Sequence, residues 1–179
     1  MKNIRIIAIC FLLLFTLPLT CFADNRPWFP IGAELLYKYI SQDVQNCTVG
    51  ELRKNPNTDS YDFYVYKSPG YMRLNVNLAY NADGYVTAIS IGSSHITDEY
   101  SKFTVGVSVA ALRQIGLTHD EVQFLANNIS EISRTPQDIC YASSVHSSAM
   151  QHSIALLIDH ETNGELLVFI VRDPNDKYN

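Results

Sequence analysis

Hydroxyl and imidazole side chains gather in one segment, Ser143-Ser-Val-His-Ser-Ser148, and again at His152 and Ser153. A histidine with a pKa near neutrality can take a proton from a serine, so these residue types could supply the nucleophile and base of a small hydrolase. The sequence contains neither the Gly-x-Ser-x-Gly turn nor the Ser-x-x-Lys spacing that presents such a serine. We therefore expect a polar strand or loop and no catalytic residue, and keep a secreted Ser/His hydrolase acting through residues 143–153 as the alternative function.

A second cluster of chemically active side chains is Asp159, His160 and Glu161, which could ligate a metal together with His146 or His152. The His-Glu pair is not followed by the second histidine of the helical zinc-protease motif. We expect solvated turn residues here and no metal. The sequence also lacks the glycine patterns that cradle phosphates, so no nucleotide or other cofactor is expected.

Tyrosine is the compositional excess of the chain, with 11 residues, and many of them fall between residues 61 and 85. On one predicted strand, apolar side chains alternate with a polar set that contains tyrosine, arginine and asparagine. Such a mixture is common at recognition surfaces because tyrosine offers contact area at little cost in rotamer entropy, although tyrosine also simply suits strands. The predicted binding residues are Tyr64, Tyr66, Tyr71, Arg73, Asn75 and Asn77.

The first 23 residues have the pattern of a cleavable secretory signal peptide. Lys2 and Arg5 precede an apolar stretch, and the small residue Ala23 ends the segment. A retained membrane anchor and a lipidated Cys21 are the alternatives. We predict a secreted or periplasmic protein whose mature part, residues 24–179, forms one domain without a membrane span.

Removal of the signal peptide leaves 11 basic residues against 18 acidic ones, a net charge of −7. A surface of this sign repels phosphate backbones, which argues against nucleic-acid or anionic-lipid partners. Two cysteines remain, Cys47 and Cys140. In an oxidising compartment we predict a disulfide between them, with two separately buried thiols as the alternative.

Hydrophobic periodicity predicts the elements of the first half of the domain. An extended lead-in should dock through Trp28 and Phe29 before a helix over residues 31–40. The segment Thr48-Val-Gly-Glu51 fits a capping box, which predicts the start of a short helix. Alternating residues over 61–92 then predict three strands in an antiparallel meander.

The second half is predicted to contain a helix over residues 103–115 and a second helix that begins at the capping box Thr118-His-Asp-Glu121, packed as an αα-hairpin. Strands should follow over 139–145, 153–158 and 165–171, with a turn from Asp159 to Gly164. The last two strands are apolar at nearly every position, so both of their faces should be covered, by helices or by a homodimer contact.

This order of elements predicts an α+β domain in which helices gather on one face of an antiparallel sheet, with a loose two-fold repetition of the helix-and-strand pattern. Since no catalytic motif is present, the predicted function is the binding of a protein or peptide partner by an exported, non-enzymatic domain. An inhibitor, an immunity factor and an adhesion-type factor all fit this description. A homodimer through the 153–171 hairpin is the remaining partner expected.

Overall fold

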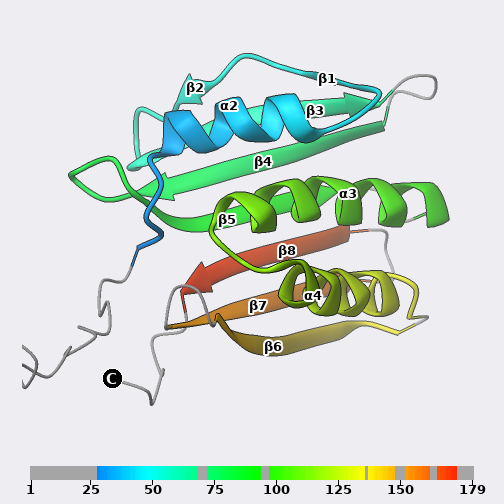
Figure 1. The fold of residues 1–179 in the computed structure, drawn as a ribbon. Coiled ribbons are helices and arrows are strands. Elements are labelled where there is room, and N and C mark those ends of the chain that lie inside the picture. Colours follow the sequence, from blue (N-terminus) through cyan, green and yellow to red (C-terminus); the bar gives the residue numbers. More distant parts are fainter. Residues whose placement is uncertain are drawn as a thin grey trace, which may run out of the picture.

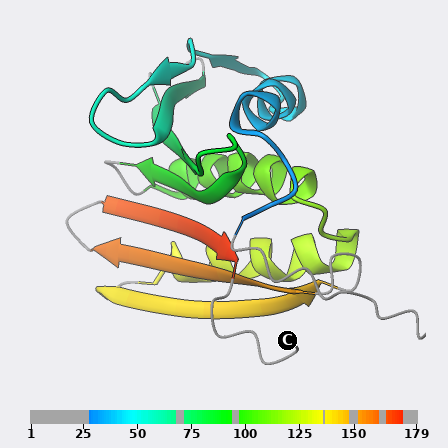
Figure 2. The same ribbon diagram turned by 90° about the vertical axis from the view of Figure 1, so that its left-hand side faces the viewer.

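The computed structural model describes residues 28–67, 72–93, 97–135, 137–147, 152–161 and 165–172, so the predicted signal peptide lies outside the described residues. An eight-stranded antiparallel sheet carries helices on one face (Figures 1 and 2), which confirms the predicted α+β class. The elements are β1 (Cys47–Val49), β2 (Arg53–Lys54), β3 (Ser60–Lys67), β4 (Met72–Tyr80), β5 (Val86–Ser93), β6 (Ile139–Ser147), β7 (His152–Glu161), β8 (Glu165–Arg172), α2 (Ala33–Asp43), α3 (Asp98–Gln114) and α4 (His119–Ile132). None of these helices is long and apolar enough to cross a membrane.

The strands follow the order β1-β3-β4-β5-β8-β7-β6, and β2 pairs with β3 beside β1. Two meanders, β3-β4-β5 and β6-β7-β8, therefore meet where β5 pairs with β8 (Figure 1). A helix precedes each meander, α2 the first and α4 the second. The arrangement has the two-fold helix-and-strand pattern that the sequence predicts, with α3 as the connection between the halves.

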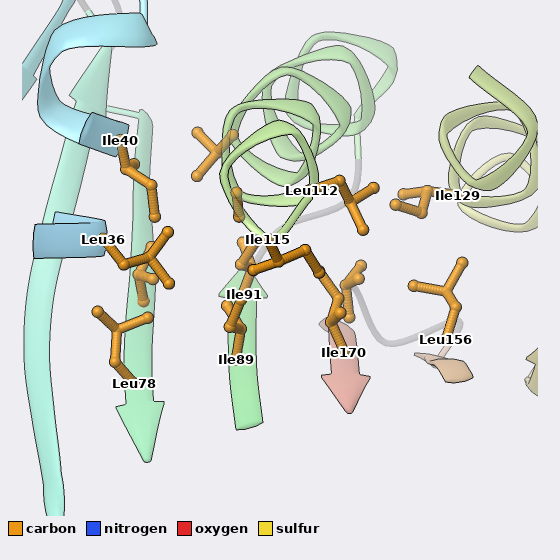
Figure 3. Packing of buried hydrophobic residues seen from close by; sticks show 14 of the residues in the cluster. Leu36, Ile40, Leu78, Ile89, Ile91, Leu112, Ile115, Ile129, Leu156 and Ile170 are labelled. Carbon is orange, nitrogen blue, oxygen red and sulfur yellow. The ribbon is translucent and has the colours of Figure 1, made fainter. Parts of the chain in front are cut away.

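One hydrophobic core fills the space between the sheet and the helices. Helix α2 packs over β4, α3 over β5, and α4 over β6 and β7. Figure 3 shows fully buried side chains of this core, among them Leu36, Ile40, Leu78, Ile89, Ile91, Leu112, Ile115, Ile129, Leu156 and Ile170. Burial of this many aliphatic side chains on one face of the sheet is the main favourable contribution to folding.

The chain before α2 is fastened to the sheet, as predicted for the lead-in. The Phe29 side chain is fully buried, and its backbone N–H donates to the Val86 carbonyl at 2.7 Å. The Val86 N–H in turn donates to the Ile31 carbonyl at 3.0 Å. Trp28 stacks on Tyr85 with ring centroids 6.5 Å apart. These contacts fix where α2 begins relative to β5.

The capping box predicted at Thr48 is wrong, because the segment forms the edge strand β1 instead of a helix start. Thr48 and Val49 pair with Tyr66 and Val65 of β3, and the Gly50 N–H donates to the Tyr64 carbonyl at 2.8 Å. β-branched residues favour the extended backbone, and the edge of β3 offers hydrogen-bond partners that a short isolated helix lacks.

The two central helices agree better with the sequence. Helix α3 begins earlier than predicted, because the Thr97 side chain accepts a hydrogen bond from the Tyr100 N–H and so caps its N-terminus. Helix α4 begins at the predicted capping box: the Thr118 side chain accepts from the Glu121 N–H, and the Glu121 carboxylate accepts from the Thr118 N–H at 2.7 Å. Gly116, at φ +89°, makes the turn between the helices.

The two threonines provide a direct test. Thr118→Ala should lower the free energy of unfolding by about 1 kcal/mol, because it removes the acceptor that caps α4. Thr48→Ala, the matched control in the exposed edge strand, should change it by less than about 0.5 kcal/mol. Urea unfolding of both variants followed by circular dichroism measures the difference, and equal destabilisation would contradict the assignment of the cap.

Candidate functional site

The helices all lie on the same side of the sheet (Figure 2), so the opposite face, here called the open face, has no helix of the described chain on it. Alternation along the strands determines which side chains lie there. Phe63, Val65, Leu74 and Val76 are buried on the helix side. Their strand neighbours therefore point to the open face.

Five of the six predicted binding residues fall on this open face. Cross-strand register pairs Tyr64 with Asn75, Tyr66 with Arg73, and Asp62 with Asn77. All of these positions alternate with the buried ones, so one patch at the β3-β4 end of the sheet contains five of the six predicted residues. Tyr71, the sixth, lies outside the described residues.

Within this patch the side chains contact one another. The Arg73 guanidinium lies over the Tyr64 ring, with Cζ 4.8 Å from the ring centroid, and the Tyr64 and Tyr66 rings are 6.1 Å apart. The Asn77 amide donates to the Asp62 carboxylate at 2.8 Å. These contacts pre-order the patch, since a stacked guanidinium and adjacent rings lose less freedom on binding than isolated side chains. The Asn75 side chain is exposed and has no hydrogen-bond partner among the described residues, so its amide can bond to a ligand.

A hollow of about 370 Å³ lies on the open face between this patch and the junction of β5 with β8. Its lining residues are Tyr64, Arg73, Asn75, Gly92, Ser93, Glu165, Leu166 and Leu167. The hollow exists partly because Gly92 has no side chain above the sheet. It offers a cation, a carboxylate, an amide and apolar surface within one concave area, which is the composition of a recognition site.

The other end of the open face is apolar. Leu157 on β7 and Leu167 on β8 are 38% and 44% exposed, respectively, and Phe169 and Val171 are half-buried between their neighbours. The described helices cover one face of β7 and β8, so helices do not supply the predicted cover of the second face. The alternative, a homodimer contact on that face, stays a prediction. An unbroken apolar run does not show which face a helix will cover, so the sequence pattern does not mark these leucines as surface residues.

Two of the clustered tyrosines lie outside the open face. Tyr61 pairs with Leu78, and its ring lies 5.0 Å from that of Tyr80. The Tyr61 hydroxyl donates to the Glu34 carboxylate at 3.1 Å, and this hydrogen bond is the largest cause of the raised pKa of Tyr61. These residues attach the start of α2 to β3.

The Ser/His segment divides between the two faces of β6. Ser143 faces the helices, where its hydroxyl accepts a hydrogen bond from the Asn128 amide at 3.1 Å. His146 faces the open side, and its Nδ1 lies 3.4 Å from Ser153 Oγ on the paired strand β7. Asp159 shares this face of β7 but stands six residues further along, roughly 20 Å away. Among the described residues the fold brings His146 beside Ser153, and it keeps Asp159 away from this pair, so Asp159 is not the acid of a Ser-His-acid site.

Strand β7 extends to Glu161, so the turn predicted to begin at Asp159 is wrong. In this strand, successive side chains point to opposite faces of the sheet, and this separates the residues considered as metal ligands. Asp159 is exposed on the open face, whereas His160 is buried on the helix side with Nδ1 3.0 Å from the Gln137 carbonyl. Among the described residues no three His, Cys, Asp or Glu side chains come together as a metal site.

The predicted disulfide does not form in this structure, where Cys47 and Cys140 are both free. Cys47 lies in β1 and Cys140 in β6, the strands at the two ends of the sheet order. Six strand spacings of about 4.8 Å put them roughly 29 Å apart, whereas a disulfide requires Cα atoms within about 7 Å. The number of cysteines can be read from the sequence, but the order of the strands in the sheet cannot. It is the strand order that keeps the two cysteines apart.

No protein-family model, curated protein or solved structure matches this chain. Its function is therefore inferred from the surface of the fold and from the side chains on it. The open face is the feature that combines exposed aromatic, amide, charged and apolar groups. It is the candidate site.

The two thiols allow a test of the strand order. In the protein without residues 1–23, both thiols should react with a maleimide at pH 8 under non-reducing conditions. Cys140 should react about five-fold or more faster, because it is exposed whereas burial raises the pKa of the Cys47 thiol. Cys140→Ser should remove the fast phase, and a Cys47–Cys140 cross-linked peptide in the mass spectrum would contradict the fold.

Proposed function

We propose that this protein is an exported, non-enzymatic domain that binds a protein or peptide partner through the open face of its sheet. The signal-peptide pattern of residues 1–23 supports export to the periplasm or the exterior. The observation on which the binding proposal depends is the one-sided cover of the sheet: the described helices bury one face and leave the other, with its leucines and tyrosines, to solvent.

The residue types on the open face support a protein partner. Tyrosine and arginine are enriched among residues that dominate binding energies, and Tyr64, Tyr66 and Arg73 lie together at one end. Leu167 lines the same hollow as Tyr64 and Arg73, and Leu157 extends the apolar area toward the other end of the face. A contiguous surface that passes from polar aromatic to aliphatic resembles the rim and core of a protein interface.

The dimensions of the face also suit a protein. Five strand spacings of about 4.8 Å separate β3 from β6, and strands of eight residues are about 27 Å long, which gives a flat area of roughly 650 Å². Side chains project from the sheet, so the accessible area of the face is larger than this flat area and approaches the roughly 800 Å² that each partner buries in a standard interface. The excess of acidic residues in the chain favours a partner that is not a nucleic acid.

The open face predicts the outcome of a capture experiment. The protein without residues 1–23 is used to capture partners from its native exterior, in parallel with the variant Tyr64→Ala/Asn75→Ala. Loss of a stacked tyrosine and a free amide from the centre of an interface should weaken binding about 30-fold or more. A partner identified by mass spectrometry with the wild type should be absent with the variant.

The matched control is Tyr39→Ala/Asn127→Ala, which removes the same residue types from exposed positions of α2 and α4. It should retain the partner. Sedimentation equilibrium of the purified protein, carried out first, tells whether a second copy occupies the face through Leu157 and Leu167. Retention of every partner by the open-face variant would contradict the proposal, and ester hydrolysis that Ser153→Ala abolishes would favour the alternative hydrolase.

A further inference from the structure

A separate hollow lies on the helix side of the sheet, where the end of α2 and strand β1 meet α3. Its volume is about 300 Å³, at the small end of the range for small-molecule sites. The apolar part of its wall comes from Val44 after α2 and from Phe103, Val107 and Val109 of α3. This wall can bury an aliphatic group of a few carbon atoms.

Basic residues surround the hollow. Lys67, Lys102 and Arg113 line it with one acid, Asp43. Arg113 Nη1 lies 3.4 Å from Asp43 Oδ2, so this pair is largely neutral. The two lysines have no ion-pair partner in the described part of the chain. The hollow is therefore locally positive, although the net charge of the chain is −5. The negative net charge argues against nucleic-acid partners of the whole surface, but it does not prevent this hollow from attracting a small anion.

Gly106 stands in the middle of α3 and lines the same hollow. Glycine is among the least favourable residues inside a helix. A Cβ at this position would meet no heavy atom within 4 Å outside the helix itself, so close packing does not explain the glycine. The absence of a side chain keeps the hollow open between the apolar wall and the lysines.

We propose that this hollow binds a small carboxylate with an unbranched apolar tail. The tail lies against Val44 and Val109, which are only partly buried, in the space left by Gly106, and the carboxylate lies between Lys67 and Lys102. An inorganic anion would leave the apolar wall unused, and an uncharged lipid would leave two lysines without a counter-ion. The site is on the opposite side of the sheet from the open face and does not depend on the proposed function.

Octanoate is the probe for the test, added to the protein without residues 1–23 and followed by calorimetry. It should bind saturably, and the affinity should rise about four-fold for each CH₂ from hexanoate to octanoate, the increment expected for a buried methylene. Octylammonium and 1-octanol, which lack the negative charge, should bind at least about ten-fold more weakly. Equal binding of all three would overturn the proposal.

Two variants separate the charge from the cavity. Lys67→Gln/Lys102→Gln should weaken octanoate binding about ten-fold or more, whereas Lys38→Gln/Lys54→Gln, with the same change in net charge, should keep it within about two-fold. Gly106→Leu should fill the hollow and abolish binding. Because leucine is a better helix former, this variant should unfold at no lower a temperature than the wild type, which shows that lost binding is not lost folding.

The cysteines supply an independent readout, because Cys47 lines this hollow and Cys140 lies at the far edge of the sheet. Saturating octanoate should slow alkylation of Cys47 about five-fold or more and leave the rate at Cys140 unchanged. The open-face variant Tyr64→Ala/Asn75→Ala should still bind octanoate. Loss of octanoate binding in that variant, or equal protection of both cysteines, would overturn the assignment of the site.

Discussion

The antiparallel pairing of β5 with β8 is the contact on which the rest of this structure depends. It places Ile89 opposite Ile170 and Ile91 opposite Val168, and these side chains form the centre of the core beneath α3. Each meander alone would end in an unpaired strand, β5 or β8, and an unpaired strand with an apolar face is a template for pairing with other chains. The pairing joins both meanders into one sheet with one continuous core, although the paired residues are far apart along the chain.

The same construction explains why two kinds of surface are available for binding. A two-layer domain buries one face of its sheet, so the residues on the other face do not have to be apolar or to pack in the core. Here that face carries Tyr64 and Arg73 at one end and Leu157 at the other. On the helix side, α2 covers the first meander and α3 covers the junction, and a hollow lined by lysines lies between the end of α2 and the side of α3.

Local sequence patterns predicted an element correctly where no neighbouring strand offered the same segment an alternative set of hydrogen bonds. The capping box at Thr118 begins a helix whose apolar stripe packs on the sheet, so propensity and packing agree. The same sequence pattern at Thr48 fails, because the backbone of β3 stands beside it and offers hydrogen bonds that a short helix cannot match. The patch on β3 and β4 was predictable because alternation alone puts Tyr64, Arg73 and Asn75 on one side of their strands.

The sequence by itself determined the α+β class, the meanders and which residues share a face of each strand, because these follow from periodicities within single segments. Only the tertiary structure decided which face the helices cover, and so made Leu157 and Leu167 surface residues. It also decided the strand order, which puts Cys47 and Cys140 on opposite edges of the sheet. These outcomes depend on contacts between segments distant in the chain, and such contacts are selected by the packing of the whole core, which no local pattern contains.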